Sequence, residues 1–145
     1  MEKDITTIIK QIYEQARLLN ACDLFKGTED LQAIIRLFCS PQGIEFCMKN
    51  HFPNTATFRL FKQYNLEKHG IYIDAGNITL NNPTQAILIG RTSATVNCTT
   101  TERHEVILLH GAKAVVNASR WAVAFTKVEG GCSIIKNTSE NAIIL

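Results

Sequence analysis

The sequence predicts an α+β protein in which an N-terminal helical subdomain (residues 1–69) caps a short parallel β-solenoid (residues 70–145). Three observations predict it. Apolar residues recur at helical spacing in the first half, short β-prone runs replace them from Gly70 onward, and these runs repeat with asparagine at a constant place. Stacked repeats bury a continuous core between neighbouring copies, and this is the physical basis of a solenoid.

The first helix is predicted from one apolar face. Its members fall at steps of three and four residues, and they are Ile5, Ile8, Ile9, Ile12, Tyr13, Ala16 and Leu19. Asn20 follows this face, and we expect the helix to stop there because asparagine tolerates a left-handed backbone.

Capping signals predict three further helices. Their N-caps are predicted at Thr28, Ser40 and Asn54. In the second helix, Glu29 and Asp30 are expected in the first turn, where the helix dipole favours carboxylates. In the third, Pro41 stands at the first helical position, where its missing N–H costs no hydrogen bond.

The stacked strands of the second half are predicted from a repeated β-prone segment. The copies are residues 78–82, 94–98, 114–118 and 134–138, so they start 16, 20 and 20 residues apart. The asparagines of the four copies are Asn81, Asn97, Asn117 and Asn137. Successive coils stack about 4.8 Å apart, so equivalent side chains lie over one another. We therefore predict that these four amides form a structural ladder along the solenoid axis.

A second apolar run accompanies each repeat. These runs are residues 71–73, 87–89, 107–109, 123–125 and 143–145. Residues 143–145 are Ile-Ile-Leu, and an apolar edge strand invites pairing with another chain. We predict a homo-oligomer formed through this C-terminal strand, most simply a two-fold dimer.

In period and asparagine position, residues 70–145 resemble the parallel β-helix proteins, in which stacked coils with asparagine ladders recur. The resemblance implies the architecture alone. Some members of that group bind or cleave polysaccharides, form fibres or transfer acyl groups, but their catalytic patterns have no counterpart here. Asp74, for example, is the only aspartate after residue 30, so an acidic calcium-binding cluster is lacking. Short strands at this spacing are also consistent with an antiparallel β-sandwich or barrel.

Composition excludes several classes of protein. Hydrophobic residues make up 46% and charged residues 19%, and the net charge of +2 is spread evenly, which disfavours nucleic-acid binding. No apolar run reaches the roughly 20 residues of a membrane span. The five cysteines are Cys22, Cys39, Cys47, Cys98 and Cys132. Their odd number and spacing predict buried thiols of a reducing compartment. We expect a soluble cytoplasmic chain without metal, cofactor, membrane or nucleic-acid partner.

Few residues suggest chemistry. Cys47 and His51 are four apart on a predicted helix, which fits a thiol–imidazole pair or half a metal site, although a core role is the preferred interpretation. Trp121 is a candidate for stacking on a sugar or anchoring a partner. His104 and His110 are candidates for contact across coils. We predict Trp121, His104 and His110 as binding residues, and we assign no catalytic residue.

Two function classes follow. The preferred one is a non-catalytic structural or interaction module that presents a solenoid surface to a protein or glycan. The alternative is a carbohydrate-active enzyme, and its candidate residues are His69, Asp74, His104, Glu105 and His110. Convergence of two or more of these side chains within hydrogen-bond reach would favour the enzyme.

Overall fold

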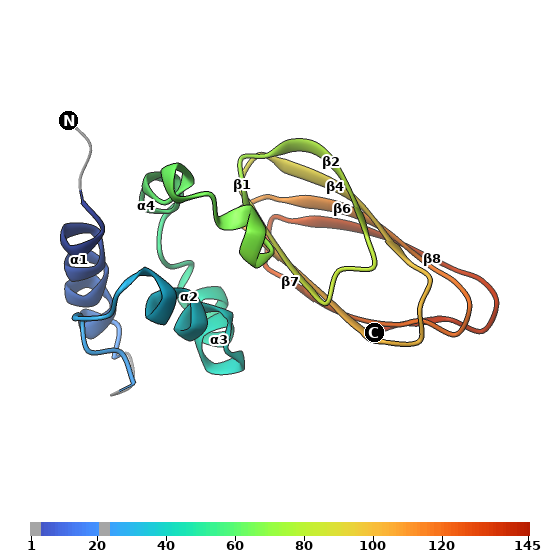
Figure 1. Cartoon of the computed structure of the whole chain (residues 1–145), viewed down its shortest axis with the longest axis horizontal. Coiled ribbons are helices and arrows are strands. Elements are labelled where there is room, and N and C mark those ends of the chain that lie inside the picture. The colour runs from blue at the N-terminus through green and yellow to red at the C-terminus, as the bar shows by residue number, and fades with distance from the viewer. Residues whose placement is uncertain (1–3, 21–23) are drawn as a thin grey trace. The chain divides into compact units, whose positions relative to one another are not determined.

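The computed structural model describes residues 4–20 and 24–145. The chain divides into two compact units, Met1–Phe61 and Lys62–Leu145 (Figure 1). This division falls at residue 62 rather than 70, because the 3-10 turns η1 (Lys62–Tyr64) and η2 (Leu66–His69) belong to the second unit. Lys62 Nζ, for example, donates to the Asp74 carbonyl oxygen at 2.8 Å, which ties η1 to the first coil.

The helices of the first unit are α1 (Ile5–Leu18), α2 (Leu31–Cys39), α3 (Pro41–Asn50) and α4 (Thr55–Leu60). The predicted caps of α3 and α4 are confirmed, since Ser40 Oγ accepts from the Gly43 N–H and Asn54 Oδ1 from the Thr57 N–H. Of the predicted apolar face of α1, Ile8, Ile9, Ile12 and Ala16 are buried, and Ile5 and Tyr13 are half-buried. Leu19 is exposed and lies just after the helix.

The predicted start of the second helix is wrong. Asp30, not Thr28, is the N-cap of α2, and its Oδ1 accepts the Ala33 N–H at 2.8 Å. Glu29 lies before the helix, where its carboxylate accepts the N–H groups of Lys26 and Gly27, both at 2.8 Å. The two carboxylates therefore satisfy backbone donors at the helix start and in the turn before it, and neither lies in the first turn.

Gly43 interrupts the helical pattern of α3 for a steric reason. A Cβ atom at this position would lie 2.1 Å from the Leu37 carbonyl oxygen at the end of α2. Only glycine allows the backbones of α2 and α3 to approach this closely.

Nine strands of the described residues form two parallel sheets. The first sheet contains β1 (Ile71–Ile73), β3 (Gln85–Ile89), β5 (Arg103–Leu109), β7 (Val123–Val128) and β9 (Ile143–Ile144). The second contains β2 (Gly76–Asn81), β4 (Thr92–Cys98), β6 (Lys113–Ala118) and β8 (Ser133–Thr138). Consecutive strands alternate between the sheets, so the chain winds as a parallel β-solenoid of about four turns (Figure 1). The antiparallel alternative is excluded because every strand pairing is parallel.

The register of the second sheet is the one that the repeat predicts. Ile78 pairs with Ala94, Ala94 with Ala114, and Ala114 with Ile134. The change of period from 16 to 20 residues arises at one corner. The segment between the asparagine and the next strand is four residues longer in the later coils, which extend farther at that corner than the first coil (Figure 1).

One expected equivalence among the apolar runs is wrong. Residues 123–125 pair with 103–105 rather than with 107–109, and Val123 continues the stack to Ile143. The partner of Ile107 on the next coil is instead Lys127. Hydrophobicity alone suggested the wrong pairing, because the apolar part of the strand shifts by four residues between these coils.

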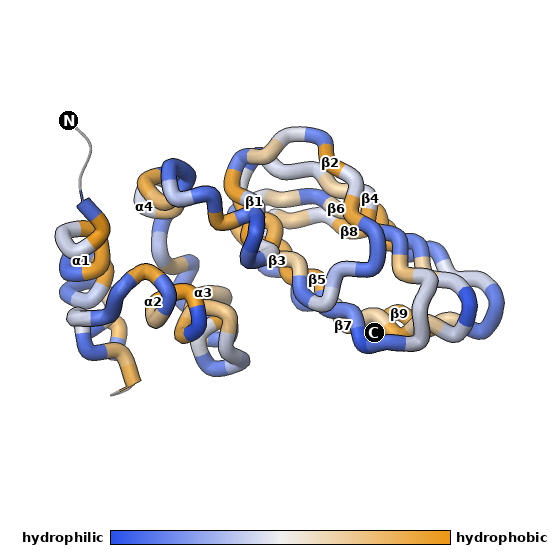
Figure 2. The backbone as a smooth tube through the Cα atoms, in the orientation of Figure 1, coloured by the Kyte–Doolittle hydropathy of each residue, from blue (hydrophilic) through white to orange (hydrophobic). Residues whose placement is uncertain are grey.

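The solenoid interior is apolar. It is lined by stacks such as Leu88 over Leu108 and Val96 over Val116, all fully buried, with alanines between them. Hydrophobic residues are concentrated along the strands (Figure 2). On β8 the valine stack ends at Lys136, an exposed residue in an inward register position. A lysine at this place protects an edge strand against pairing.

Candidate functional site

The four repeated asparagines form a hydrogen-bonded ladder. Nδ2 of Asn97 donates to Oδ1 of Asn81 at 3.1 Å, and Nδ2 of Asn117 to Oδ1 of Asn97 at 3.1 Å. Nδ2 of Asn137 donates to Oδ1 of Asn117 at 2.9 Å. Each inner asparagine thus donates once and accepts once, and the ladder joins all coils of the second sheet.

The ladder predicts a graded loss of stability. Asn117→Ala removes two of these hydrogen bonds and should lower the free energy of unfolding by about 2 kcal/mol, whereas Asn137→Ala removes one and should cost about 1 kcal/mol. Urea denaturation followed by circular dichroism measures both. Equal losses for the two variants would show that the amides do not act as a ladder.

Polar side chains at the corners bind the backbone of the next coil. Asp74 Oδ1 accepts the Arg91 N–H at 2.8 Å, and Asn82 Oδ1 accepts the Thr99 N–H at 2.7 Å. At a third corner, the carboxylate of Glu129, which is 4% exposed, accepts the N–H of His110 at 2.9 Å. Each of these side chains satisfies a backbone amide at a corner of a neighbouring coil.

His104 is another such inter-coil contact. It is 1% exposed, and its Nδ1 lies 2.8 Å from the carbonyl oxygen of Pro83 on the preceding coil. A carbonyl only accepts, so Nδ1 carries the proton of this bond. Nε2 lies 3.2 Å from the Thr100 hydroxyl, which donates to it. The structure therefore buries this predicted binding residue with both ring nitrogens engaged.

His110 lies at the opposite end of β5. His104 is six positions earlier along the extended strand, which corresponds to about 20 Å, so the two imidazoles do not meet. Nδ1 of His110 is 3.9 Å from Glu129 Oε1.

The other candidate residues are also dispersed. His69 precedes β1 and Asp74 follows it, so they lie at opposite ends of that strand. The carboxylate of Glu105 contacts Arg103 at 3.6 Å, in the row of side chains on the outer face of the first sheet. The enzyme candidates thus occupy both ends of the sheet. In the first unit, Cys47 is buried on α3. His51 follows that helix, is exposed and has a left-handed backbone conformation.

The cysteines of the solenoid are not activated nucleophiles. Burial raises the pKa of the Cys98 thiol and the pKa of the Cys132 thiol above their ordinary value, which keeps both protonated near neutral pH. Cys22 lies outside the described residues.

Trp121 occupies an unusual turn. The Ala122 N–H donates to the Ser119 carbonyl at 3.1 Å, and Arg120 and Trp121 between them have φ angles of 55° and 64°. Two central residues with positive φ define a type I′ turn, which favours glycine and asparagine. The stacked turn on the next coil carries Asn141 at the position of Trp121, also with a positive φ. A left-handed conformation costs an ordinary residue about 1–2 kcal/mol.

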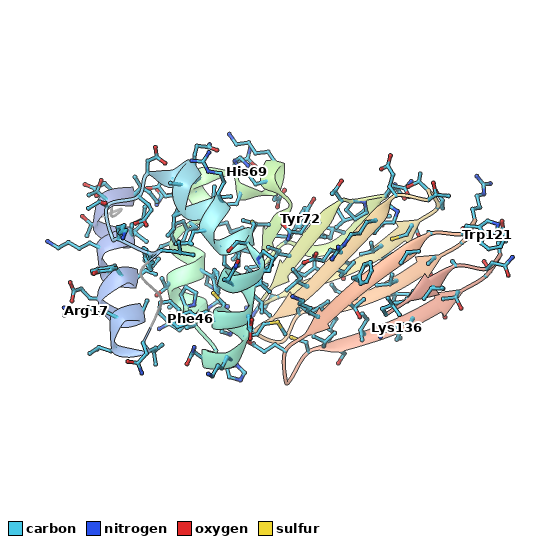
Figure 3. All side chains as sticks on the ribbon, turned by 90° about the horizontal axis from the view of Figure 1, so that it is seen from below. Arg17, Phe46, His69, Tyr72, Trp121 and Lys136 are labelled. Carbon is cyan, nitrogen blue, oxygen red and sulfur yellow. The ribbon has the colours of Figure 1, made fainter. Side chains whose placement is uncertain are left out.

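The same tryptophan is 65% exposed and lies at the far end of the sheets, beyond the strands (Figure 3). Neither burial nor backbone preference explains a tryptophan there. In the sequence, only its residue type marked Trp121 as a candidate. The segment Ser-Arg-Trp-Ala at 119–122 has neither glycine nor asparagine at its two central positions, so it does not predict a turn. Its stacked equivalent, Ser-Glu-Asn-Ala at 139–142, does carry that signal.

Trp121 begins an exposed apolar surface, which we name the terminal patch. Its members are the exposed residues Trp121, Ile143 and Leu145 and the half-buried residues Val123 and Phe125. Val123 and Phe125 of β7 and Ile143 of β9 lie on the outer face of the first sheet, because the alternating residues Ala124 and Ile144 face the core. Trp121 precedes β7, and Leu145 follows β9. Ile143 and Leu145 are 52% and 57% exposed. The Arg103 guanidinium lies over the Phe125 ring, 4.3 Å from its centroid, and borders the patch.

Comparison with family models, curated proteins and solved structures found no match to this chain. Among the described residues, no helix has both the length and the apolar character needed to cross a membrane.

Proposed function

We propose that this chain is a non-catalytic interaction module that presents the terminal patch to a protein or glycan partner. The observation that carries the proposal is Trp121, which is 65% exposed at a turn position that suits glycine or asparagine. The residue gains little from burial and adopts a disfavoured backbone conformation. Such a residue is explained by a contact that it makes with another molecule.

The rest of the solenoid supports this division of roles. The polar side chains at the corners bind backbone amides of neighbouring coils, as Asp74, Asn82 and Glu129 do. The described solenoid residues that were candidates for acid–base chemistry lie at both ends of the first sheet and do not converge. A rigid coil stack that carries an exposed aromatic residue and a flanking apolar face is suited to binding.

The proposal predicts that removing Trp121 stabilises the fold. Trp121→Asn should raise the free energy of unfolding by about 1 kcal/mol, because asparagine tolerates positive φ better than tryptophan does. Trp121→Ala is the matched control: it removes the same exposed surface but keeps the backbone cost, so its stability should stay within about 0.5 kcal/mol of the wild type. Urea denaturation measures both. A loss of stability in both variants would make Trp121 a structural residue and contradict the proposal.

Binding is tested with the same variants. Trp121 is the only tryptophan of the chain, so its fluorescence reports on the patch directly. An array of neutral and acidic oligosaccharides tests for a glycan partner, and a measurement of self-association tests for a protein partner. The expected result is that the wild type binds in one of these two experiments and that Trp121→Asn does not. A patch that takes part in neither, or binding that survives the substitution, would count against the proposal.

A further inference from the structure

We infer that the partner of the terminal patch is a second copy of this chain, docked face to face about a two-fold axis that runs parallel to the strands between β7 and β9. The inference rests on the proposed function, because it assigns an occupant to the same surface. It depends on a property of the patch that the register shows: the apolar residues Val123 and Phe125 of β7 lie beside the apolar residues Ile143 and Leu145 of the next coil.

The geometry of such an axis is simple. A two-fold axis along the strands, midway between two adjacent rows, turns the face over and exchanges the rows. A residue on β7 then lies opposite the β9 residue that is its register partner within one chain. Val123, which pairs with Ile143, would face Ile143 of the partner subunit. One step of alternation farther along the same rows, Phe125 would face Leu145 of the partner subunit.

The charges follow the same rule. Arg120 and Glu140 hold the same position in the stacked turns 119–122 and 139–142, and both are exposed. The turns are joined directly, since the Trp121 N–H donates to the Glu140 carbonyl at 3.0 Å. Across the proposed axis, Arg120 would face Glu140 of the partner subunit, and the symmetry would form this ion pair twice. Opposite charges at these two positions make the patch self-complementary.

The two edge strands differ in a way that supports this placement. Lys136 occupies an inward register position on β8 and discourages pairing there. On β9 the residues that follow the turn are apolar, and Ile143 is 52% exposed. The exposed apolar residues around β9 therefore favour contact with an apolar face.

Charge reversal tests the inference on the full chain. Sedimentation equilibrium should show a wild-type dimer of twice the 16.2 kDa chain mass, with a blue shift of Trp121 emission as concentration rises. Arg120→Glu and Glu140→Arg each place like charges opposite each other twice, and each should weaken dimerisation by about tenfold or more. Lys113→Glu, a reversal on the second sheet, is the control and should leave dimerisation unchanged.

Recombining the charges is the decisive step. An equimolar mixture of Arg120→Glu and Glu140→Arg should form the heterodimer, because each contact again joins opposite charges. The double variant R120E/E140R should likewise regain the wild-type dimer. A wild-type chain that stays monomeric at about 1 mM, or reversals that are not rescued by mixing, would overturn the inference. That result would leave the proposed function to the Trp121→Asn stability test and the oligosaccharide array, which do not depend on self-association.

Discussion

Replacing Gly70 by alanine should lower the free energy of unfolding of the solenoid by about 3 kcal/mol. Gly70 has a φ angle of 78°, and a Cβ atom there would lie 2.4 Å from the Gln85 carbonyl oxygen. That oxygen belongs to backbone in β3, so the clash is not relieved by moving a side chain. The Gly70 carbonyl also accepts the Ile87 N–H at 2.8 Å, and a shift of Gly70 would break this first bond between coils.

Gly111→Ala is the matched control. Its φ angle is 83°, close to that of Gly70, but a Cβ atom there meets nothing within 4 Å. This variant should show the cost of the left-handed backbone alone, about 1–2 kcal/mol. Urea denaturation of the two variants separates steric contact from backbone conformation. Similar losses would mean that the close approach of Gly70 to β3 contributes nothing.

The architecture could be predicted from the sequence because the coils of a solenoid repeat, and each coil carries the same pattern of residues. The spacing of Asn81, Asn97, Asn117 and Asn137 defines the register of the second sheet without reference to distant parts of the chain. A single β-strand could pair in many ways, but a repeated one pairs best with its neighbouring copy.

The first sheet was harder to align because two of its signals conflict. The apolar run at 123–125 looks like 107–109, yet the strand at 103–109 is seven residues long and pairs with 123–128 from its start. Chain length between corners decides the register, and it outweighs the hydrophobic match. The charged Lys127 opposite Ile107 is the consequence.

The functional surface was only partly accessible from the sequence. Trp121 was found by its residue type, but its backbone conformation was not, since Arg120 and Trp121 carry no turn signal of their own. The turn is indicated instead by Asn141, 20 residues later. Because the coils repeat, Trp121 occupies the same turn position as Asn141. The burial of His104 was also not accessible from the sequence. It stands in the polar stretch of residues 99–105, yet the Pro83 carbonyl and Thr100 bind both nitrogens of its buried ring.

Replacing Leu108 by alanine should cost the solenoid about 2–5 kcal/mol. Leu108 is fully buried and lies between Leu88 and Val128 in the stack that fills the interior. Successive coils are fixed about 4.8 Å apart by their hydrogen bonds, so the walls are not free to collapse into the space left behind. The loss should therefore fall in the upper part of that range.

Ile135→Ala provides the control for Leu108→Ala. It truncates an apolar side chain in a strand of the same solenoid, but the Ile135 side chain is 59% exposed. Its cost should stay within about 0.5 kcal/mol. Thermal and urea denaturation of both variants give the comparison. Equal costs would mean that the interior between the two sheets is not the main source of stability. The rigidity that the terminal patch needs as a docking surface would then have to come from the asparagine ladder and the corner hydrogen bonds instead.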